Sequence, residues 1–284
     1  MNVLIPLDGS SLAEGILRHV PPLLMARKAK LLLLQVLPRG ATEQEEAAAL
    51  RYLSEASEEV AASGEEPEAI LRIGDPADQI LSVADDYQAD QIVMATHGRS
   101  GVARLIRGSV AERVLRNATV PVYLASPKGL SGRSGETFRR VLIPLDGSKL
   151  AASILPLVLP IVSDSQAEVV LLHVSVPGSE SVHPVPEVAK KRAQEKAETT
   201  LKEVQENLSA VGVKAHVVGA YGDPAEELLE AIERHEADLL AMTSHGREGL
   251  SRWRFCWSWC CYLYNRHFCF RRRCCSRSGI NSAV

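Results

Sequence analysis

The sequence predicts an α/β fold in which two doubly wound parallel sheets, of five strands each, follow one another along the chain. Three observations lead to this prediction. Residues 3–10, Val-Leu-Ile-Pro-Leu-Asp-Gly-Ser, return unchanged at residues 141–148, so the chain of 284 residues contains one unit twice. Within each copy, short apolar runs alternate with amphipathic segments, which is typical of β-α units. The apolar runs lack a polar face, as expected for strands buried on both sides of a parallel sheet.

Other landmarks of the repeat follow in the same order. Residues 74–77 match 222–225, and residues 94–99 match 242–247. Matching residues are 138 positions apart at the start of the repeat and 148 apart from residue 74 onward, so the second copy carries an insertion. A period this long indicates duplicated domains rather than a solenoid. We expect four segments: a first domain at 1–126, a Gly- and Ser-rich linker at 127–139, a second domain at 140–255 and a tail at 256–284.

Each element of the first copy has its own signal. The expected strands, by their apolar runs, are 3–7, 31–37, 68–73, 91–95 and 121–125. The expected helices run from Ser10 or Ser11 to about Lys28, over 42–62, from Pro76 with Asp75 as its cap, and over 109–116. Right-handed crossovers then give a doubly wound parallel sheet, in which we expect the strand order 3-2-1-4-5. The second copy repeats this series to about Arg254, with an inserted loop at 183–186 and a charged helix at 187–209.

Composition argues against several classes of function. The net charge of −3 gives no basic field for nucleic acid. No apolar run approaches the roughly 20 residues that span a bilayer, and Met1 leads into a strand-like segment rather than a signal peptide. The first 250 residues contain no cysteine, so no disulfide links the body of the two copies. These features predict a cytoplasmic protein without membrane or nucleic-acid partners.

The predicted sheet also predicts where a ligand would bind. Doubly wound sheets bind ligands beyond the carboxyl ends of the strands, where the strand order reverses, here between the first and fourth strands. Residues 6–10 follow the first strand, and the small-residue loop 95–101 follows the fourth. This loop runs on to Gly108 and Ser109 at a helix start, where backbone N–H groups can bind phosphates. Asp8 faces the loop and could accept hydrogen bonds from a ribose or an adenine amine.

These residues, with the duplication, resemble a tandem universal stress protein of the universal stress protein A superfamily, over about 1–126 and 140–255. The nucleotide-binding pattern of that family is Gly, two residues, Gly, nine residues, then Gly followed by Ser or Thr. Gly98, Gly108 and Ser109 match it, whereas Ala95 stands where the first glycine belongs. The resemblance implies an adenine-nucleotide alpha-hydrolase-like fold and a site made by Pro6, Asp8, Val36, Met94, Ala95, His97, Gly98, Gly108, Ser109 and Val110.

The function that the resemblance implies is binding and signalling in a stress response rather than catalysis. The ligand would be ATP or a related adenine nucleotide, with Mg²⁺ held mainly by the phosphates. Two alternatives stay open: a slow ATPase in which His97 orders water, and a nucleotide-free scaffold that acts through dimerisation, which Ala95 favours slightly. The two copies could form an intramolecular pseudo-dimer, or the chain a homodimer.

The second copy matches the family pattern only in part. Its remnants of the site are Pro144, Asp146, Val174, Met242, His245 and Gly246, and Thr243 replaces the first glycine. Nine residues after Gly246, Cys256 and Trp257 stand where Gly and Ser are required, and the resemblance ends there. We therefore expect a second pocket that does not bind nucleotide and a copy incomplete at its last helix and strand. The strand at 121–125 would then be left exposed or be matched by tail residues.

Plainer interpretations exist for several of these residues. Asp8 and Asp146 could be ordinary helix caps, although Ser10 and Ser148 are better placed. Met94 and Met242 suit the core as well as an adenine contact. No nucleophile or second acid accompanies His97 or His245, which argues against a catalytic base. The arginines of the loop, which could steer phosphates or simply be solvated, are Arg99, Arg104 and Arg107.

The tail differs abruptly in composition, because all six cysteines and all three tryptophans lie after residue 252. Its cysteines and His267 suggest zinc, but their spacing lacks a CxxC pair. A basic aromatic segment for nucleic acid or membrane is a second interpretation. We favour a change of reading frame in the gene near codon 255, because the composition shifts at a defined step of the repeat. Resequencing that found an intact frame would remove this hypothesis.

Overall fold

The computed structural model describes residues 1–19, 29–61, 66–95, 109–125, 138–176, 187–243 and 268–272. The elements of the first copy are β1 (Asn2–Leu7), α1 (Ser11–His19), β2 (Lys30–Leu37), α3 (Glu43–Ala61), β3 (Glu68–Ile73), α4 (Pro76–Asp86), β4 (Gln91–Ala95), α5 (Ser109–Asn117) and β5 (Val122–Ala125). Those of the second copy are β6 (Arg140–Pro144), α7 (Lys149–Ala152), α8 (Leu155–Ser165), β7 (Glu168–Ser175), α9 (Glu187–Ala210), β8 (Ala215–Tyr221), α10 (Pro224–Arg234) and β9 (Leu239–Thr243). A last strand, β10 (Phe268–Arg272), comes from the tail.

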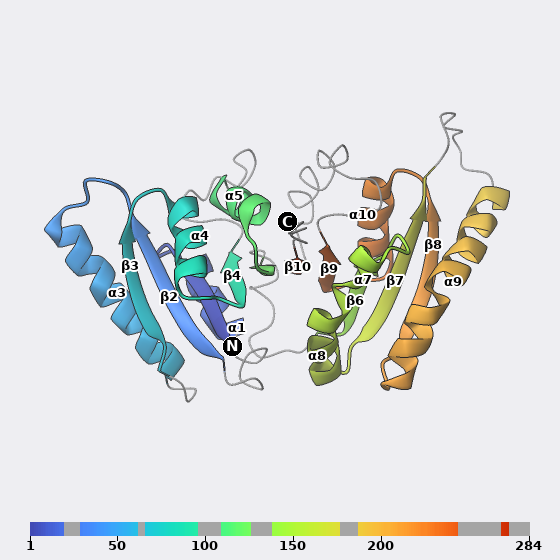
Figure 1. Cartoon of the computed structure of the whole chain (residues 1–284), viewed down its shortest axis with the longest axis horizontal. Coiled ribbons are helices and arrows are strands. Elements are labelled where there is room, and N and C mark those ends of the chain that lie inside the picture. The colour runs from blue at the N-terminus through green and yellow to red at the C-terminus, as the bar shows by residue number, and fades with distance from the viewer. Residues whose placement is uncertain are drawn as a thin grey trace, which may run out of the picture.

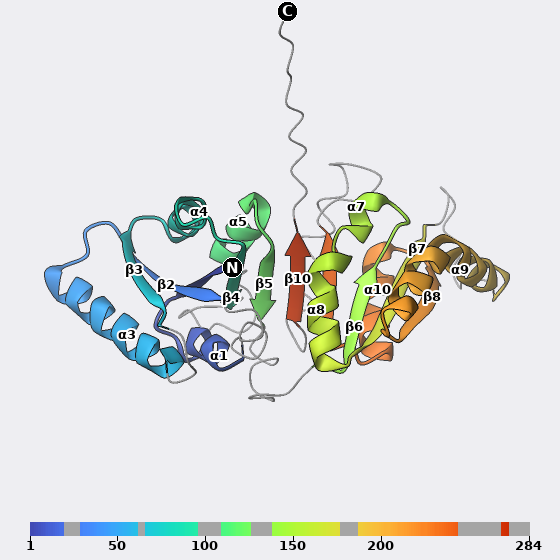
Figure 2. The same ribbon diagram turned by 60° about the horizontal axis from the view of Figure 1, so that its bottom comes forward.

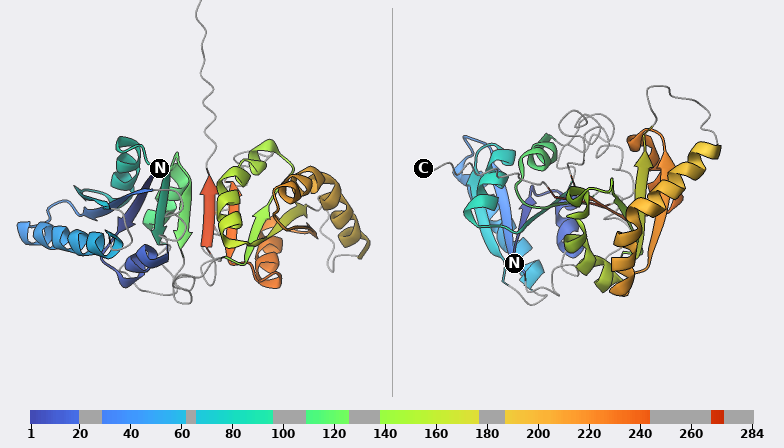
Figure 3. Two further views of the ribbon diagram at one scale, coloured as in Figure 1. Left: turned by 90° about the horizontal axis from the view of Figure 1, so that it is seen from below. Right: turned by 45° about the vertical axis from the view of Figure 1, so that its right-hand side comes forward.

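The strands form one sheet in the order β3-β2-β1-β4-β5-β10-β9-β6-β7-β8, with helices on both faces (Figures 1 and 3). Strands β1 to β5 all pair in parallel, which gives the predicted order 3-2-1-4-5. Strands β6 to β9 repeat the order and direction of β1 to β4. The predicted fold class is therefore confirmed for both copies.

The tail completes the sheet. Strand β10 lies between β9, with which it pairs in parallel, and β5, with which it pairs antiparallel (Figure 2). The repeated sequence of the second copy supplies four strands, as expected of an incomplete copy, and the fifth place is taken by residues outside the repeat. Of the two outcomes foreseen for β5, pairing with the tail is the one found.

The junction between the two halves has a two-fold symmetric register. Tyr123 lies beside Val93 of β4, and Phe270 lies beside Ala241 of β9, so Tyr123 and Phe270 occupy equivalent places in the repeat. These two residues face each other across the antiparallel pair β5–β10. A local two-fold axis therefore passes through this pair, as expected for an intramolecular pseudo-dimer.

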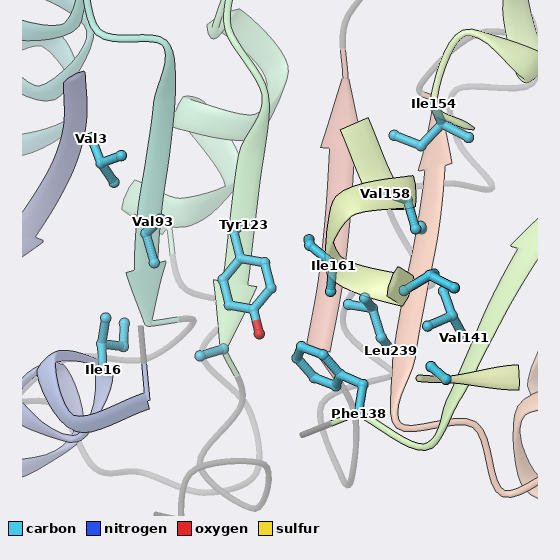
Figure 4. Close-up of a cluster of buried hydrophobic side chains, with 14 of the residues drawn as sticks. Val3, Ile16, Val93, Tyr123, Phe138, Val141, Ile154, Val158, Ile161 and Leu239 are labelled. Carbon is cyan, nitrogen blue, oxygen red and sulfur yellow. The ribbon is translucent and has the colours of Figure 1, made fainter. Parts of the chain in front are cut away.

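The strands bury side chains on both faces, which explains their unbroken apolar runs. On one face a single core cluster extends through both copies and includes Leu33 and Val141. Figure 4 shows where it crosses from one copy to the other, with Tyr123 of β5 on one side and Ile161 of α8 and Phe138 on the other. On the opposite face, α4, α5 and α10 pack on a second cluster. Burying a Val, Leu or Ile side chain contributes about 1.5–3 kcal/mol. The apolar residues therefore strongly favour the observed placement of the strands.

The helix starts confirm one prediction and correct another. Asp75 caps α4 by accepting from the N–H groups of Ala77 and Asp78 at 3.0 and 3.1 Å, and Asp223 caps α10 in the same way. Repetition of the first copy predicts one helix after β6, but the structure has two, α7 and α8. Pro156 lies in the first turn of α8, where its missing N–H needs no partner, which accounts for a new helix start there. The expected extension of α1 to about Lys28 lies outside the described residues.

Candidate functional site

The carboxyl ends of β1 and β4 meet at one edge of the sheet in the first copy. The two strands are parallel neighbours, with Val3 beside Gln91 and Leu4 beside Ile92. From β1 the chain proceeds to β2 and β3 on one side, and later to β4 and β5 on the other, so the strand order reverses here. The same reversal lies between β6 and β9 in the second copy. Each reversal is the place where a doubly wound sheet binds its ligands.

A tight Asp-Gly-Ser turn follows the first strand in each copy. Asp8 Oδ1 accepts from the backbone N–H of Ser10 at 3.1 Å and from its hydroxyl at 2.6 Å. In the second copy, Asp146 Oδ1 accepts from the N–H of Ser148 at 2.9 Å. The residue between is glycine because the backbone there has a positive φ, 74° at Gly9.

The serines, and not the aspartates, cap the helices that follow. Ser10 Oγ accepts from the N–H of Ala13 at 3.2 Å, and Ser148 Oγ accepts from the N–H of Ala151 at 3.0 Å. The interpretation of the two aspartates as plain caps is therefore wrong. Each carboxylate braces the turn that holds the capping serine, and it does so at the edge where a ligand would bind.

The other predicted residues of the first copy lie around the same edge or just beneath it. Pro6 and Ala95 are half-buried at the ends of β1 and β4, and Val36, near the end of β2, packs against the core cluster under α4. Met94 is buried in that cluster, which supports a role in the core. Ser109 is exposed at the first position of α5, and Val110 packs inward beside it.

An ion-pair network fixes the helix that begins at Ser109. Arg113 of α5 donates through Nη1 to both carboxylate oxygens of Asp75, at 2.8 Å each, and through Nη2 to Asp78 at 2.5 Å. The hydrogen bond from the N–H of Asp78 is the largest cause that lowers the pKa of Asp75, and the Arg113 guanidinium lowers it further. The cap of α4 is thus also the anchor of α5.

Buried polar side chains beside the turn were not anticipated from the sequence. Gln35 on β2 and His173 on β7 occupy the same place in the repeat, and their exposed fractions are 5% and 6%. His173 Nδ1 lies 3.0 Å from the carbonyl oxygen of Leu145, and it must donate that bond because a carbonyl only accepts. The N–H of Leu145 in turn donates to the carbonyl oxygen of Leu172 at 2.8 Å. Leu145, the residue before Asp146, is therefore hydrogen-bonded through both its N–H group and its carbonyl oxygen.

In the first copy the position of His173 is occupied by an amide side chain, that of Gln35. Gln35 lies beside Leu7 in the β1–β2 pair, directly before Asp8. Within the described part of the chain, its Oε1 has no hydrogen-bond partner, and neither has Nε2 of His173. A polar residue at matching places of two otherwise apolar strands was visible in the repeat and could have marked this position.

The second copy brings together the matching remnants of the site. Pro144 and Val174 are half-buried at the ends of their strands, as Pro6 and Val36 are. Met242 and Thr243 lie beside Arg271 and Arg272 of β10, so the backbone of the tail runs along the end of β9. In the first copy the repeated sequence itself supplies this neighbour, because Ala95 lies beside Ala125 of β5.

The remaining predicted residues lie outside the described part of the chain: His97, Gly98, Arg99, Arg104, Arg107, Gly108, His245, Gly246, Cys256, Trp257, His267 and the other cysteines of the tail except Cys269. Among the residues that the structure describes, no group of histidine, cysteine and acidic side chains could hold a metal ion. In the same part of the chain, no helix combines the length and the apolar character needed to cross a membrane.

The fold and the site define a duplicated, doubly wound α/β protein with a carboxylate-bearing turn at each reversal of the strand order. The model of the universal stress protein family matches residues 1–126 and 137–256. A universal stress protein of Methanocaldococcus jannaschii is 31% identical over 128 residues, which are 42% of this chain and 73% of that protein. One of Methanothermobacter thermautotrophicus is 31% identical over 138 residues, or 43% of this chain and 93% of that protein.

A solved structure extends the likeness to both copies. The crystal structure of a universal stress protein from Archaeoglobus fulgidus covers 96% of each chain with a TM-score of 0.74 and 22% identity, which shows a shared fold. Together with the family match over most of the sequence, this leads to one conclusion. The chain belongs to the universal stress protein family, as a tandem-domain member.

Proposed function

We propose that the first copy binds an adenine nucleotide, ATP in particular, and that the protein acts as a binding and signalling module in a cytoplasmic stress response. The observation that carries the proposal is the Asp8 turn at the reversal of the strand order. A carboxylate offers about four acceptor sites, so one carboxylate can hold a turn and also accept hydrogen bonds from a ligand. Asp8 can therefore accept from a ribose hydroxyl or an adenine amine while it braces the turn.

The start of α5 supports the phosphate side of the proposal. The first N–H groups of a helix have no partner within the helix, and the helix dipole favours an anion there. Ser109 is exposed at this position, and Arg113 ties the helix to α4 through Asp75 and Asp78. A fixed helix end costs less ordering when a ligand binds. Mg²⁺ would be held mainly by the phosphates.

A nucleotide-free scaffold is the second candidate, and Ala95 favours it. This residue ends β4 in the place of a family glycine, and its methyl group occupies space that a glycine would leave to the ligand. In that function the Asp8 turn would be structural only, and the two-fold junction of β5 and β10 would be the functional feature.

Equilibrium titration of the full chain with ATP and Mg²⁺ separates the candidates. Saturable binding with one site per chain supports the proposal. A chain that retains no nucleotide on purification and shows no heat of binding with ATP would establish the scaffold instead. Phosphate release well above the uncatalysed background, lost in His97→Ala, would establish the slow ATPase.

A further inference from the structure

The sheet ends in two outer edges, β3 and β8, and the second of these is sealed by a side chain. Gln194 of α9 accepts from the backbone N–H of Gly219 at 2.7 Å and donates through Nε2 to the carbonyl oxygen of Val217 at 3.2 Å. Gln205 donates to the carbonyl oxygen of Ala215 at 2.9 Å. The amide of Gln194 thus makes the pair of bonds that the backbone of a further strand would make, and β8 is closed to pairing.

The seal depends on a glycine. A Cβ atom at Gly219 would lie 2.5 Å from the carbonyl oxygen of Ala193 and 2.5 Å from Cα of Gln194, closer than real contacts allow. Glycine therefore lets the backbone of α9 approach the edge strand closely enough for the short Gln194 side chain to reach it.

The same places of the first copy hold residues that cannot seal the edge. Ala69 lies beside Leu33 as Val217 lies beside Leu171, so Leu71 corresponds to Gly219. The buried residues Leu53 of α3 and Leu201 of α9 correspond in turn, which places Glu46 where α9 has Gln194.

Glu46 and Leu71 cannot make the hydrogen bonds to the edge of β3 that Gln194 and Gly219 make at β8. A carboxylate cannot donate to a carbonyl oxygen, and the side chain of Leu71 packs against the core where Gly219 has none. In the described residues, the one side-chain bond to the backbone of β3 is a 3.4 Å contact from Nη1 of Arg72 to the neighbouring carbonyl oxygen of Leu71.

We propose that β3 is the edge at which a second copy of this chain pairs, antiparallel and centred on Ile70. By correspondence with Val217 and Gly219, the backbone groups of Ala69 and Leu71 point outward. Centring on Ile70 sets Ala69 opposite Leu71 of the second copy, so each such pair exchanges both of its hydrogen bonds.

The same register pairs opposite charges. It sets Glu68 of one copy, which also pairs with Lys30 of its own chain at 2.6 Å, opposite Arg72 of the other, twice, on the face that Ile70 shares. Pro67, which has no N–H, ends the paired segment at Glu68. Hydrogen-bond geometry and charge thus select one register, and the partner that satisfies both is β3 itself.

Sedimentation velocity of the full chain, under reducing conditions and over a wide range of concentration, tests the proposal. We expect a concentration-dependent dimer. Glu68→Arg and Arg72→Glu should each raise its dissociation constant severalfold, because they place like charges opposite each other, and the double exchange should restore it. His216→Glu at the matching place of the sealed edge β8 should leave the dimer unchanged.

Thermal unfolding of each variant establishes that it folds. A chain that stays monomeric at every concentration would overturn the proposal. So would single exchanges that dimerise as tightly as the parent, or a double exchange that fails to recover although it melts at the same temperature.

Discussion

The turns at Asp8 and Asp146 have the same eight-residue sequence and the same internal hydrogen bond, yet they lie in different surroundings. The first is bordered by a complete repeat, with Gln35 beneath it and β5 as the fifth strand. The second has His173 bonded to its backbone and a tail strand in the fifth place. Local sequence therefore sets the turn, whereas residues far along the chain decide whether a ligand site can form around it.

The comparison is tested most strongly by removing the two carboxylates separately. Asp8→Ala should weaken ATP binding by about 10- to 150-fold, since a hydrogen bond to a charged group contributes roughly 1.5–3 kcal/mol. Asp146→Ala should leave total binding nearly unchanged, because the second copy lacks the matching Gly-Ser of the loop. Isothermal titration measures both.

Both variants lose the bond from the serine N–H that braces the turn, and Asp8→Ala also loses the bond from the Ser10 hydroxyl. The melting temperature of each variant therefore controls for its effect on folding. If Asp146→Ala weakens binding as much as Asp8→Ala in equally stable proteins, both copies bind nucleotide and the one-site interpretation fails.

Because α9 approaches β8 closely, a Gly→Ala substitution at their contact should destabilise the protein instead of stabilising it. Gly→Ala at an unstrained position commonly stabilises by about 0.4–1 kcal/mol, through the unfolded state. Gly219→Ala should instead lower the free energy of unfolding by about 1–3 kcal/mol, because its Cβ forces α9 outward. Urea unfolding measures the change, and a stabilised variant would show that the contact is not tight.

The caps of α4 and α10 offer a matched pair with a smaller effect. Asp75→Ala and Asp223→Ala should each cost about 1 kcal/mol through the lost cap. The loss at Asp75 should be the larger of the two, because Arg113 then loses its anchor as well. Chemical unfolding of both variants at neutral pH compares them, and equal losses would mean that the Arg113 network adds nothing.

The stabilisation by the Asp75 carboxylate, through its bond from the N–H of Asp78 and its contact with Arg113, should also depend on pH. Folding lowers the pKa of Asp75 from its ordinary value of 3.8, so its ionised form stabilises the folded state. The contribution is present above pH 3.8 and is lost as the pH falls through the lowered pKa. Unfolding at a series of acidic pH values should therefore narrow the gap between Asp75→Ala and the parent, and a gap that stays constant would contradict the assignment.

The smallest expected effect on stability is that of His235, which occupies the position of Tyr87 in the first copy. Burial is the largest cause that lowers its pKa from 6.5, with Arg234 and Arg140 adding to it. Because the unfolded chain then binds the proton first, stability should fall as the pH drops below 6.5 and level off beneath the lowered pKa. His235→Tyr should flatten this part of the profile, as measured by unfolding at each pH, and an unchanged slope would assign it to other groups.

Much of this structure could be predicted from residues that act locally. The apolar runs predicted the inner strands, such as β1, β2, β6 and β7, because a continuous apolar run suits a strand buried on both faces. Asp-Pro marked the starts of α4 and α10. The break between α7 and α8 was missed even though Pro156 signals it.

Other features depended on partners distant in sequence. Nothing within 268–272 indicates that this segment would complete the sheet, because the pairing is decided by the vacant edges of β5 and β9. The repeat shows a polar residue at matching places, Gln35 and His173, but their burial beside the turn follows only from the pairing of the strands. The aspartates brace the turns that hold the capping serines, a role that depends on the local backbone and that the sequence analysis did not include.

The position of β10 has a consequence for how the protein is made. Its residues leave the ribosome after all the other strands, and yet they pair with β5, which is synthesised less than halfway along the chain. Domains generally fold as they emerge, N-terminal first. The nascent first copy must therefore expose the edge of β5 throughout synthesis of the second, and during that interval the edge is open to pairing with a neighbouring nascent chain.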